Sequence, residues 1–511
     1  MSAWSEGYTS DVTYTYGYYN ELNPINLTIP FLMAGLAPPK IENACELGFG
    51  QGISLNMHSA TSNIKWYGTD FNPSHAFFAQ SLANQAGSNQ VVISDQGFNE
   101  FCMRDDLPEF DFICLHGIWS WISDENRHII VDFIRRKLKV GGILYISYNT
   151  LPGWSAPSPI RHLLVEHKRL MSSSEHDSLV TAKAALEHSK KILEMSPILC
   201  QASPTLIPRV TQLLEQNSNY LVHEYLNQDW HPMFFAQLEK WLEPAKLSYA
   251  CSAKYLDDFS GCLFTPEQVE FINQIQNKSF AQTVKDYMLN KQFRCDYWVK
   301  GSLALSQAEV IEQWKKLRII LIINRGDIVK SISNTLTTNL LDEIFDPILD
   351  ILSDYQIHSV ADLLERLENK VEINTIFTAL AILFGKKDIR LVQDDDIIAQ
   401  VKPRCDTLNR YLISKVKDFG DIGKIAASPV TGEGFLLTEF EALCILANQS
   451  KIDQDKWTDF IWDIFKTKNR LMIKDGKTLT EEKENLAEIE RNKNLFIEKR
   501  LKIFQSLGII D

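Results

Sequence analysis

Between residues 41 and 154, short apolar runs alternate with amphipathic stretches. The runs are bounded by turn residues or charges and read IENACELG, IKWYGTDF, NQVVISDQ, FDFICLHG and GGILYISYN. Strands that alternate with helices favour a parallel sheet made of right-handed crossovers. We therefore expect an α/β domain over residues 41–154.

Behind this region the pattern changes to helical periodicity. It runs through residues 155–245, in RHLLVEHKRL, AALEHSKKILEM and LIPRVTQLLEQ. Strand character returns within residues 246–305, in KLSYACSAKY and CDYWVKGSL. We interpret these two stretches as strands that complete the sheet, which makes residues 155–245 a helical insertion.

The remaining chain predicts two mostly helical modules. In residues 306–400, the helical stretches FDPILDILSDY, VADLLERLENKV and IFTALAILFG precede the strand-like RLVQDDD, an order that favours a winged-helix-like middle domain. Residues 401–511 repeat this order weakly and predict a helical C-terminal domain. Its charged stretch TEEKENLAEIERNKN predicts a solvated helix.

Composition narrows the class of protein. The 511 residues exceed what one core supports, and 65 acidic against 52 basic side chains give a net charge of −13, which argues against nucleic acid as a partner. Nine cysteines without a CxxC pair indicate neither a zinc site nor a disulfide framework. The start has no secretory pattern, and the apolar run LRIILII is far shorter than the ~20 residues of a membrane span. We expect a cytoplasmic protein without a membrane span.

The segment that carries chemistry follows the first predicted strand. It reads Glu46-Leu47-Gly48-Phe49-Gly50-Gln51-Gly52, and its glycines allow backbone N–H groups to approach a ligand closely. Such a spacing matches many turns by chance, but its place between a strand and a helix favours a nucleotide-binding loop. We expect Glu46, Gly48, Phe49, Gly50 and Gly52 to bind the cofactor.

Carboxylates follow the next two predicted strands. Asp70, with Phe71 beside it, stands about 20 residues beyond the glycines, where an acidic side chain binds the ribose hydroxyls of a nucleotide. Asp95 and Gln96 end the third strand and suit the exocyclic amine of adenine. The alternative for Asp95 is a surface turn residue.

The acidic residue in the loop separates two classes of cofactor. Glu46 would repel the pyrophosphate of NAD, whereas the sulfonium and ammonium groups of S-adenosylmethionine attract a nearby negative charge. Dinucleotide sites also prefer the spacing GxGxxG, and the glycines here stand at every second position. We therefore predict S-adenosylmethionine as the cofactor.

Several longer stretches resemble bacterial class I methyltransferases that carry a methyltransferase regulatory domain, a group that includes the rickettsial-type protein lysine methyltransferases of outer-membrane proteins. The resemblance covers most of the chain. It is carried by ELGFGQG, FDFICLHGIWSWI, YISYNTLPGW, LVHEYLNQDWHPMFF and LNKQFRCDYWVKG. The chain departs from the family pattern at Phe49, where a small residue is usual, at Ile53, where glycine is usual, and at Asn23-Pro24, where His-Pro is usual.

The resemblance implies a Rossmann-like methyltransferase core, a dimerising helical region over residues 155–245, and C-terminal modules that help to receive a protein substrate, such as a surface or outer-membrane protein before its export. It also implies an N-terminal lid within residues 1–40, built on Tyr14, Tyr16, Tyr18 and Tyr19. Packing is the alternative for these tyrosines. We expect a homodimer.

Methyl transfer requires alignment of the acceptor and exclusion of water, and aromatic walls lower the pKa of a lysine acceptor. The candidates for this methyl-transfer chamber are Tyr16, Tyr18, His116, Trp119, Tyr148 and Asn149. His116 is also expected at the methionine end of the cofactor, and core packing is the alternative for Trp119 and for Trp121.

Other chemistries find less support in the sequence. No metal site is expected, because Asn227 stands where the second histidine of HExxH would follow His223 and Glu224. Leu115-His116-Gly117-Ile118 also lacks the Asn/Asp-Pro-Pro-aromatic motif of amide and DNA-base methyltransferases. Two alternatives to a protein-lysine methyltransferase stay open: a methyltransferase of a small molecule or cell-surface glycan, and an S-adenosylmethionine-binding regulatory protein without turnover.

Overall fold

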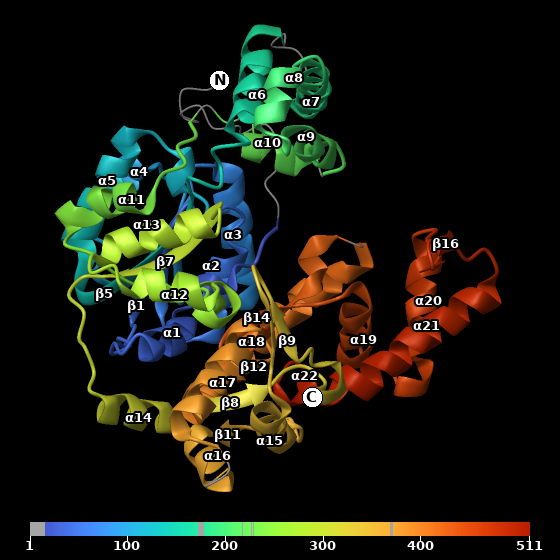
Figure 1. The fold of residues 1–511 in the computed structure, drawn as a ribbon. Coiled ribbons are helices and arrows are strands. Elements are labelled where there is room, and N and C mark those ends of the chain that lie inside the picture. Colours follow the sequence, from blue (N-terminus) through green and yellow to red (C-terminus); the bar gives the residue numbers. More distant parts are fainter. Residues whose placement is uncertain are drawn as a thin grey trace.

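The computed structural model describes residues 16–171, 178–216, 218–225, 227, 229–367, 371–418 and 420–510. A seven-stranded sheet with the order β3-β2-β1-β4-β5-β7-β6 forms the centre of its N-terminal half (Figure 1). The strands are β1 (Asn43–Leu47), β2 (Lys65–Thr69), β3 (Val91–Ser94), β4 (Phe110–Leu115), β5 (Leu138–Asn149), β6 (Ser248–Ser252) and β7 (Phe293–Val299).

The first five strands are parallel, and β7 runs antiparallel between β5 and β6. The two late stretches with strand character therefore complete the sheet. Because the carboxyl ends of β1 to β5 meet at one edge, the loops that follow these strands lie together.

Both faces of the sheet are covered, and the strand period of two assigns alternate residues of β1 to opposite faces. Cys45 and Leu47 belong to one core with residues of α5 (Asp124–Lys137) and α11 (Phe235–Leu242). Ala44 belongs to a second core with Leu55 of α2 (Ile53–Thr61) and with residues of the N-terminal segment. Further helices of this half are α1 (Thr28–Met33), α3 (Pro73–Ala86), α4 (Phe98–Phe101), α12 (Pro266–Asn273) and α13 (Lys278–Met288).

The helical insertion projects from the end of β5 as a separate bundle (Figure 1, green helices at the top). It comprises α6 (Ser158–Met171), α7 (Ser178–Glu194), α8 (Pro197–Ala202), α9 (Leu206–Leu214) and α10 (Ser218–Tyr225). Its own hydrophobic core contains Leu164, Leu186 and Val210, each at most 1% exposed. The bundle therefore packs mainly on itself.

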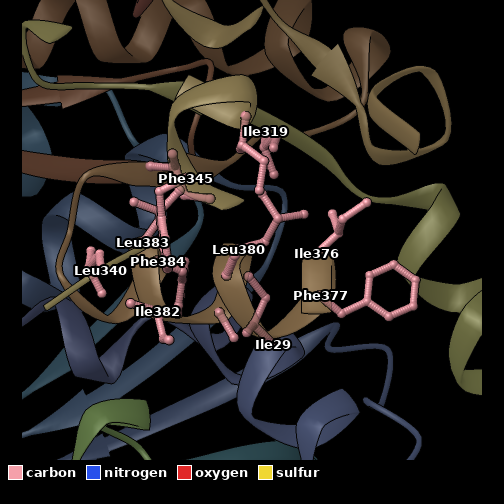
Figure 2. Packing of buried hydrophobic residues seen from close by; sticks show 14 of the residues in the cluster. Ile29, Ile319, Leu340, Phe345, Ile376, Phe377, Leu380, Ile382, Leu383 and Phe384 are labelled. Carbon is pink, nitrogen blue, oxygen red and sulfur yellow. The ribbon is translucent and has the colours of Figure 1, made fainter. Parts of the chain in front are cut away.

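The middle region contains a small antiparallel sheet in the order β11-β8-β12, together with the hairpin β9–β10. Its elements are α14 (Gln307–Lys316), β8 (Arg318–Leu321), β9 (Ser331–Ser333), β10 (Thr337–Asn339), α15 (Asp342–Leu352), β11 (His358–Ser359), α16 (Val360–Arg366), α17 (Ile373–Gly385) and β12 (Ile389–Leu391). Ile29 of α1 inserts among the apolar side chains of this region (Figure 2). The N-terminal segment thus shares a hydrophobic core with residues about 300 positions later in the chain.

The last region comprises α18 (Asp395–Ser414), β13 (Ile425–Ser428), β14 (Glu433–Leu436), α19 (Glu439–Gln449), α20 (Trp457–Thr467), β15 (Ile473–Lys474), β16 (Lys477–Thr478), α21 (Glu482–Phe496) and α22 (Lys502–Ser506). Two expectations need correction here. The boundary expected between residues 400 and 401 falls inside α18, which continues through it. The charged helix α21 is not solvated all round, because it buries Ile489 and Phe496 in the core of this region.

None of the helices in the described ranges combines the length and the apolar content that crossing a bilayer requires.

Candidate active site

The glycine loop joins the end of β1 to α2. Gly48 and Gly52 have φ of 74° and 67°, a left-handed conformation that favours glycine. A Cβ atom on Gly48 would lie 2.5 Å from Cδ1 of Ile118, and one on Gly52 would lie 2.6 Å from Cβ of Ala79. The loop therefore needs glycine both for its backbone and for its close contacts with neighbouring segments.

Asp70, at the end of β2, fixes the loop from the side. Its Oδ2 accepts a hydrogen bond from the backbone N–H of Gly50 at 2.9 Å, and its Oδ1 accepts one from Asn72 N–H at 3.0 Å. Nδ1 of His75, on the first turn of α3, lies 3.1 Å from the same Oδ1. Asn72 caps α3 and Pro73 occupies its first turn, so the local sequence starts this helix beside Asp70. The carboxylate thus couples the glycine loop to β2 and α3.

Glu46 lies in β1, next to the loop, and is 3% exposed. Its Oε2 has no hydrogen-bond partner among the residues that the structure describes. Burial, with a smaller contribution from the charge of Asp70, raises the pKa of this carboxyl to about 8. A buried carboxylate without a partner is costly, and a cationic ligand group beside it would remove that cost.

Glu46 and the loop line a cavity at the carboxyl edge of the sheet, with about 1020 Å³ of empty space including its open mouth. The walls consist of Tyr19, Glu46, Gly48, Phe49, Gly50, Asp70, Phe71, His75, Gln96, Gly97, Phe98, His116, Gly117, Ile118, Trp121, Ile122, Ser123, Asn126 and Asp229.

His116 and Tyr19 form one side of the cavity. The His116 ring lies 4.1 Å from the Tyr19 ring, centroid to centroid, and its Nδ1 lies 2.7 Å from Oη of Tyr145. Burial lowers the pKa of His116 to about 4, against a raising contribution from Glu21. The imidazole is therefore neutral at physiological pH. It is a hydrogen-bonding and packing surface there, not a cation.

Trp121 and Asp229 lie on the wall beyond β4. Trp121 belongs to the 3₁₀ turn Trp119–Trp121, and Asp229 belongs to the segment that leads from the insertion back to the sheet. Two backbone hydrogen bonds bring this segment to the site: His231 N–H donates to Ser120 O at 2.7 Å, and Met233 N–H donates to Asn149 O at 3.1 Å. The end of the insertion thus contributes a carboxylate to the cavity.

Most residues that the sequence predicts for cofactor binding meet at this cavity: Glu46, Gly48, Phe49, Gly50, Asp70, Phe71, Gln96 and His116. Two do not line it. Gly52 lies under the loop, against Ala79. Asp95 is exposed, and its neighbours Gln96 and Gly97 form the wall in its place.

The predicted methyl-transfer chamber is largely not assembled, because only His116 of its candidates lines the cavity. Trp119 is fully buried and its indole N–H donates to Sδ of Met233 at 3.2 Å, so core packing is the correct interpretation. Tyr148 is also buried, and its hydroxyl donates to Asp296 at 3.2 Å. The backbone of Asn149 bonds to Ser120 and Met233.

Of the predicted lid, Tyr14 lies outside the described residues. Tyr16 packs on Phe78 with ring centroids 5.3 Å apart, and the hydroxyl of Tyr18 accepts a hydrogen bond from Gly434 N–H at 2.8 Å. Both rings pack against other parts of the protein, and Tyr19 alone of these three faces the cavity.

Sequence reasoning missed part of the wall. Phe98 follows Gln96 by two positions and His75 follows Asp70 by five. Their closeness in the sequence to predicted cofactor residues could have indicated that they line the cavity. Asp229 had none, because its place depends on how the insertion returns to the sheet. In the described ranges no group of three or more His, Cys, Asp or Glu side chains gathers as metal ligands.

A sheet in this order, with a reversed seventh strand, a glycine loop after β1 and a carboxylate after β2, defines the class I methyltransferase fold. The solved structure of PKMT2 from Rickettsia typhi in complex with AdoHcy has this fold over nearly the whole chain, with a TM-score of 0.70, 15% identity, and coverage of 97% of this chain and 99% of that one. The Rossmann-like fold class predicted from the sequence is confirmed.

Residues 217–300 match the family described as "Predicted methyltransferase regulatory domain". An uncharacterized protein of Synechocystis, sll1526, is 35% identical over 512 residues, 99% of each chain. An uncharacterized protein of Rickettsia prowazekii, RP789, is 25% identical over 313 residues, 61% of this chain and 56% of that one. The chain belongs to the S-adenosylmethionine-dependent class I methyltransferases that carry the methyltransferase regulatory domain.

Proposed function

We propose that this protein transfers methyl groups from S-adenosylmethionine to lysine side chains of a protein substrate. The observation that carries the proposal is the unpartnered, buried carboxyl group of Glu46 in a cavity that aromatic side chains such as Tyr19 and Trp121 also line. The cofactor fits this chemistry, because its cationic groups satisfy a carboxylate that no described residue satisfies. When bound, it supplies an electrophilic methyl group.

The residues of this chain would hold the reactants as follows. Gly48 and Gly50 offer close backbone approach, Glu46 binds the cationic methionine end, and Asp70 holds the loop while facing the ribose. Alignment and exclusion of water supply most of the rate in such a displacement, so that no dedicated base is required.

On the acceptor side we place Trp121 and Asp229. The carboxylate of Asp229 attracts a lysine ammonium, and the loss of hydration beside the apolar ring of Trp121 favours the neutral amine once water is displaced. PKMT2 of Rickettsia typhi, solved in complex with AdoHcy, shares the fold of this chain at 15% identity and supports the cofactor of this proposal.

We further propose a homodimer formed through the helical insertion. Large apolar side chains are exposed on this bundle, a pattern typical of an interaction surface. They are Leu170 (63%), Met171 (69%), Val180 (59%), Met195 (75%) and Ile198 (83%). A cytoplasmic location is proposed from the nine cysteines, which are all free and, apart from Cys200, buried. The C-terminal modules, winged-helix-like in our interpretation, would help to receive the substrate.

The test is incubation with radiolabelled S-adenosylmethionine and whole-cell lysate or outer-membrane fractions, followed by gel autoradiography and identification of the labelled residue. Glu46→Gln should strongly reduce labelling at limiting S-adenosylmethionine, and Glu42→Gln, an exposed carboxylate just before β1, is the matched control. A protein band with methyl-lysine supports the proposal. Label confined to small molecules or glycans, or cofactor binding without any label, contradicts it.

A further inference from the structure

The segment that carries Tyr19 is held by the far end of the chain. On one side of Tyr19, the Tyr18 hydroxyl accepts the N–H of Gly434 at 2.8 Å. On the other side, the Asn23 side chain donates to Gly432 O at 2.6 Å. Both partners belong to the hairpin β13–β14, more than 400 residues later. The aromatic residue on the cavity wall is thus bracketed by contacts with the C-terminal region.

Glu433 is the centre of this contact. Its Oε1 accepts hydrogen bonds from Nδ2 of Asn26 at 2.5 Å and from Nδ2 of Asn20 at 3.1 Å. Its Oε2 lies 2.8 Å from Nε of Arg390 on β12, as an ion pair without hydrogen-bond geometry. Glu433 is 1% exposed, so these partners are what stabilises its charge.

The hairpin also lies against α2, the helix that follows the glycine loop. Thr61 at the end of α2 donates to Gly432 O at 2.8 Å. A Cβ atom on Gly434 would lie 2.8 Å from Cγ of Met57 and 2.9 Å from Cζ of Tyr18, so the backbone of β14 is wedged between α2 and the N-terminal segment. Ile29 attaches the same N-terminal segment to the middle region as well (Figure 2).

Tyr19 links this contact to the site. Its backbone N–H donates to Oγ of Ser54 in the first turn of α2 at 2.8 Å, and its ring lies on His116 in the cavity wall. Asn20, the next residue, is bonded to Glu433. Glu433 holds Asn20, and Asn20 follows Tyr19 directly in the chain. Loss of the Glu433 side chain should therefore shift the Tyr19 ring on the cavity wall.

We propose that Glu433 is a positioning residue of the cofactor site, which acts by holding Tyr19 over His116 from the opposite end of the chain. The inference rests on the proposed binding of S-adenosylmethionine in this cavity. It predicts that the C-terminal region contributes to cofactor affinity although none of its residues lines the cavity among those described.

The experiment is a double-mutant cycle on the full-length chain, with the Kd of S-adenosylmethionine measured by calorimetry. Glu433→Ala should weaken binding about tenfold, the effect of losing hydrogen bonds to a charged group. In a Tyr19→Ala background the same change should add less than about twofold, because the residue through which it acts is gone. If Glu433→Ala only destabilised the fold in general, its effect on the binding free energy would add to that of Tyr19→Ala.

A milder variant guards against loss of folding. Asn20→Ala removes one hydrogen bond to Glu433 and should weaken binding severalfold. Its matched control is Asn63→Ala, since Asn63 also bonds to the C-terminal region, to Gln400 at 2.7 Å, but away from Tyr19. Additive effects of Glu433→Ala and Tyr19→Ala, or unchanged affinity in Asn20→Ala, would overturn the inference alone. A wild-type chain that does not bind S-adenosylmethionine would overturn the proposed function and this inference with it.

Discussion

Replacement of Glu46 by glutamine should stabilise the ligand-free protein and weaken cofactor binding at the same time. The folded protein raises the pKa of Glu46 from 4.5 to about 8 because the carboxyl is buried beside Asp70. The folded state is therefore more stable with Glu46 protonated than with Glu46 ionised. The relative stability that Glu46 contributes is fully present below about pH 4.5 and is lost as pH rises toward 8.

The magnitude follows from the pKa difference. At pH 7 the unfolded chain ionises Glu46 while the folded protein keeps it mostly protonated, which costs about 3 kcal/mol at ~1.4 kcal/mol per unit. Glutamine has the same shape and does not titrate. The variant should therefore match wild type near pH 4.5 and become more stable than wild type as pH increases to 8.

Binding should change in the opposite direction. The cofactor needs ionised Glu46, so that wild-type affinity, relative to the variant, should rise about tenfold per pH unit between about pH 6 and pH 8 and then level off. At pH 8 glutamine should bind about 100-fold more weakly, the value expected for a lost charged partner.

Stability is measured by calorimetric unfolding at pH 5 and pH 8. The unfolding transition to compare is the one whose temperature S-adenosylhomocysteine raises in wild type. Affinity is measured by isothermal titration calorimetry over the same pH range. Glu42→Gln, on an exposed carboxylate, controls for the loss of one charge. A variant that is less stable than wild type at pH 8, or an affinity ratio independent of pH, would refute the reasoning.

Three further outcomes are expected. Asp70→Ala should leave the fold intact by circular dichroism and weaken S-adenosylmethionine binding about tenfold or more, because the Gly50 N–H loses its acceptor; unchanged affinity by calorimetry would contradict it. Trp121→Ala should raise the KM for the acceptor at least about tenfold with the cofactor Kd within about twofold of wild type, and equal losses in both would place Trp121 on the cofactor instead. The wild-type chain should have a dimeric mass by light scattering at micromolar concentration and Ile198→Lys a monomeric one, whereas a monomeric wild type would exclude the proposed dimer.

Local pattern was sufficient for the sheet and for the cofactor side of the cavity. Each of the seven stretches predicted as strands of the main sheet contains one of β1 to β7, because alternation and turn residues are short-range signals. Glu46, Gly48 and Asp70 follow from strand ends, since parallel strands bring these ends to one edge.

The acceptor side required information that local pattern does not contain. Trp119 and Trp121 are two residues apart in the sequence, yet one is buried in the core and the other lines the cavity, because the 3₁₀ turn directs them differently. Asp229 reaches the wall through backbone pairing with the end of β5, and Tyr18 is turned away by Gly434. These placements depend on contacts between distant segments, which periodicity does not encode.

The attachment of the N-terminal segment to the hairpin β13–β14 has a consequence for how the protein matures. Tyr18 and Asn20 find their partners only when residues 433–434 have left the ribosome, roughly 20 to 80 s after their own synthesis at typical elongation rates. Until then the sheet can form, but the segment that carries Tyr19 lacks its contacts with the hairpin β13–β14. A chain that terminates before residue 433 would therefore have a complete glycine loop and an unfinished active site, and the fold itself would delay catalytic competence until the hairpin β13–β14 has been synthesised.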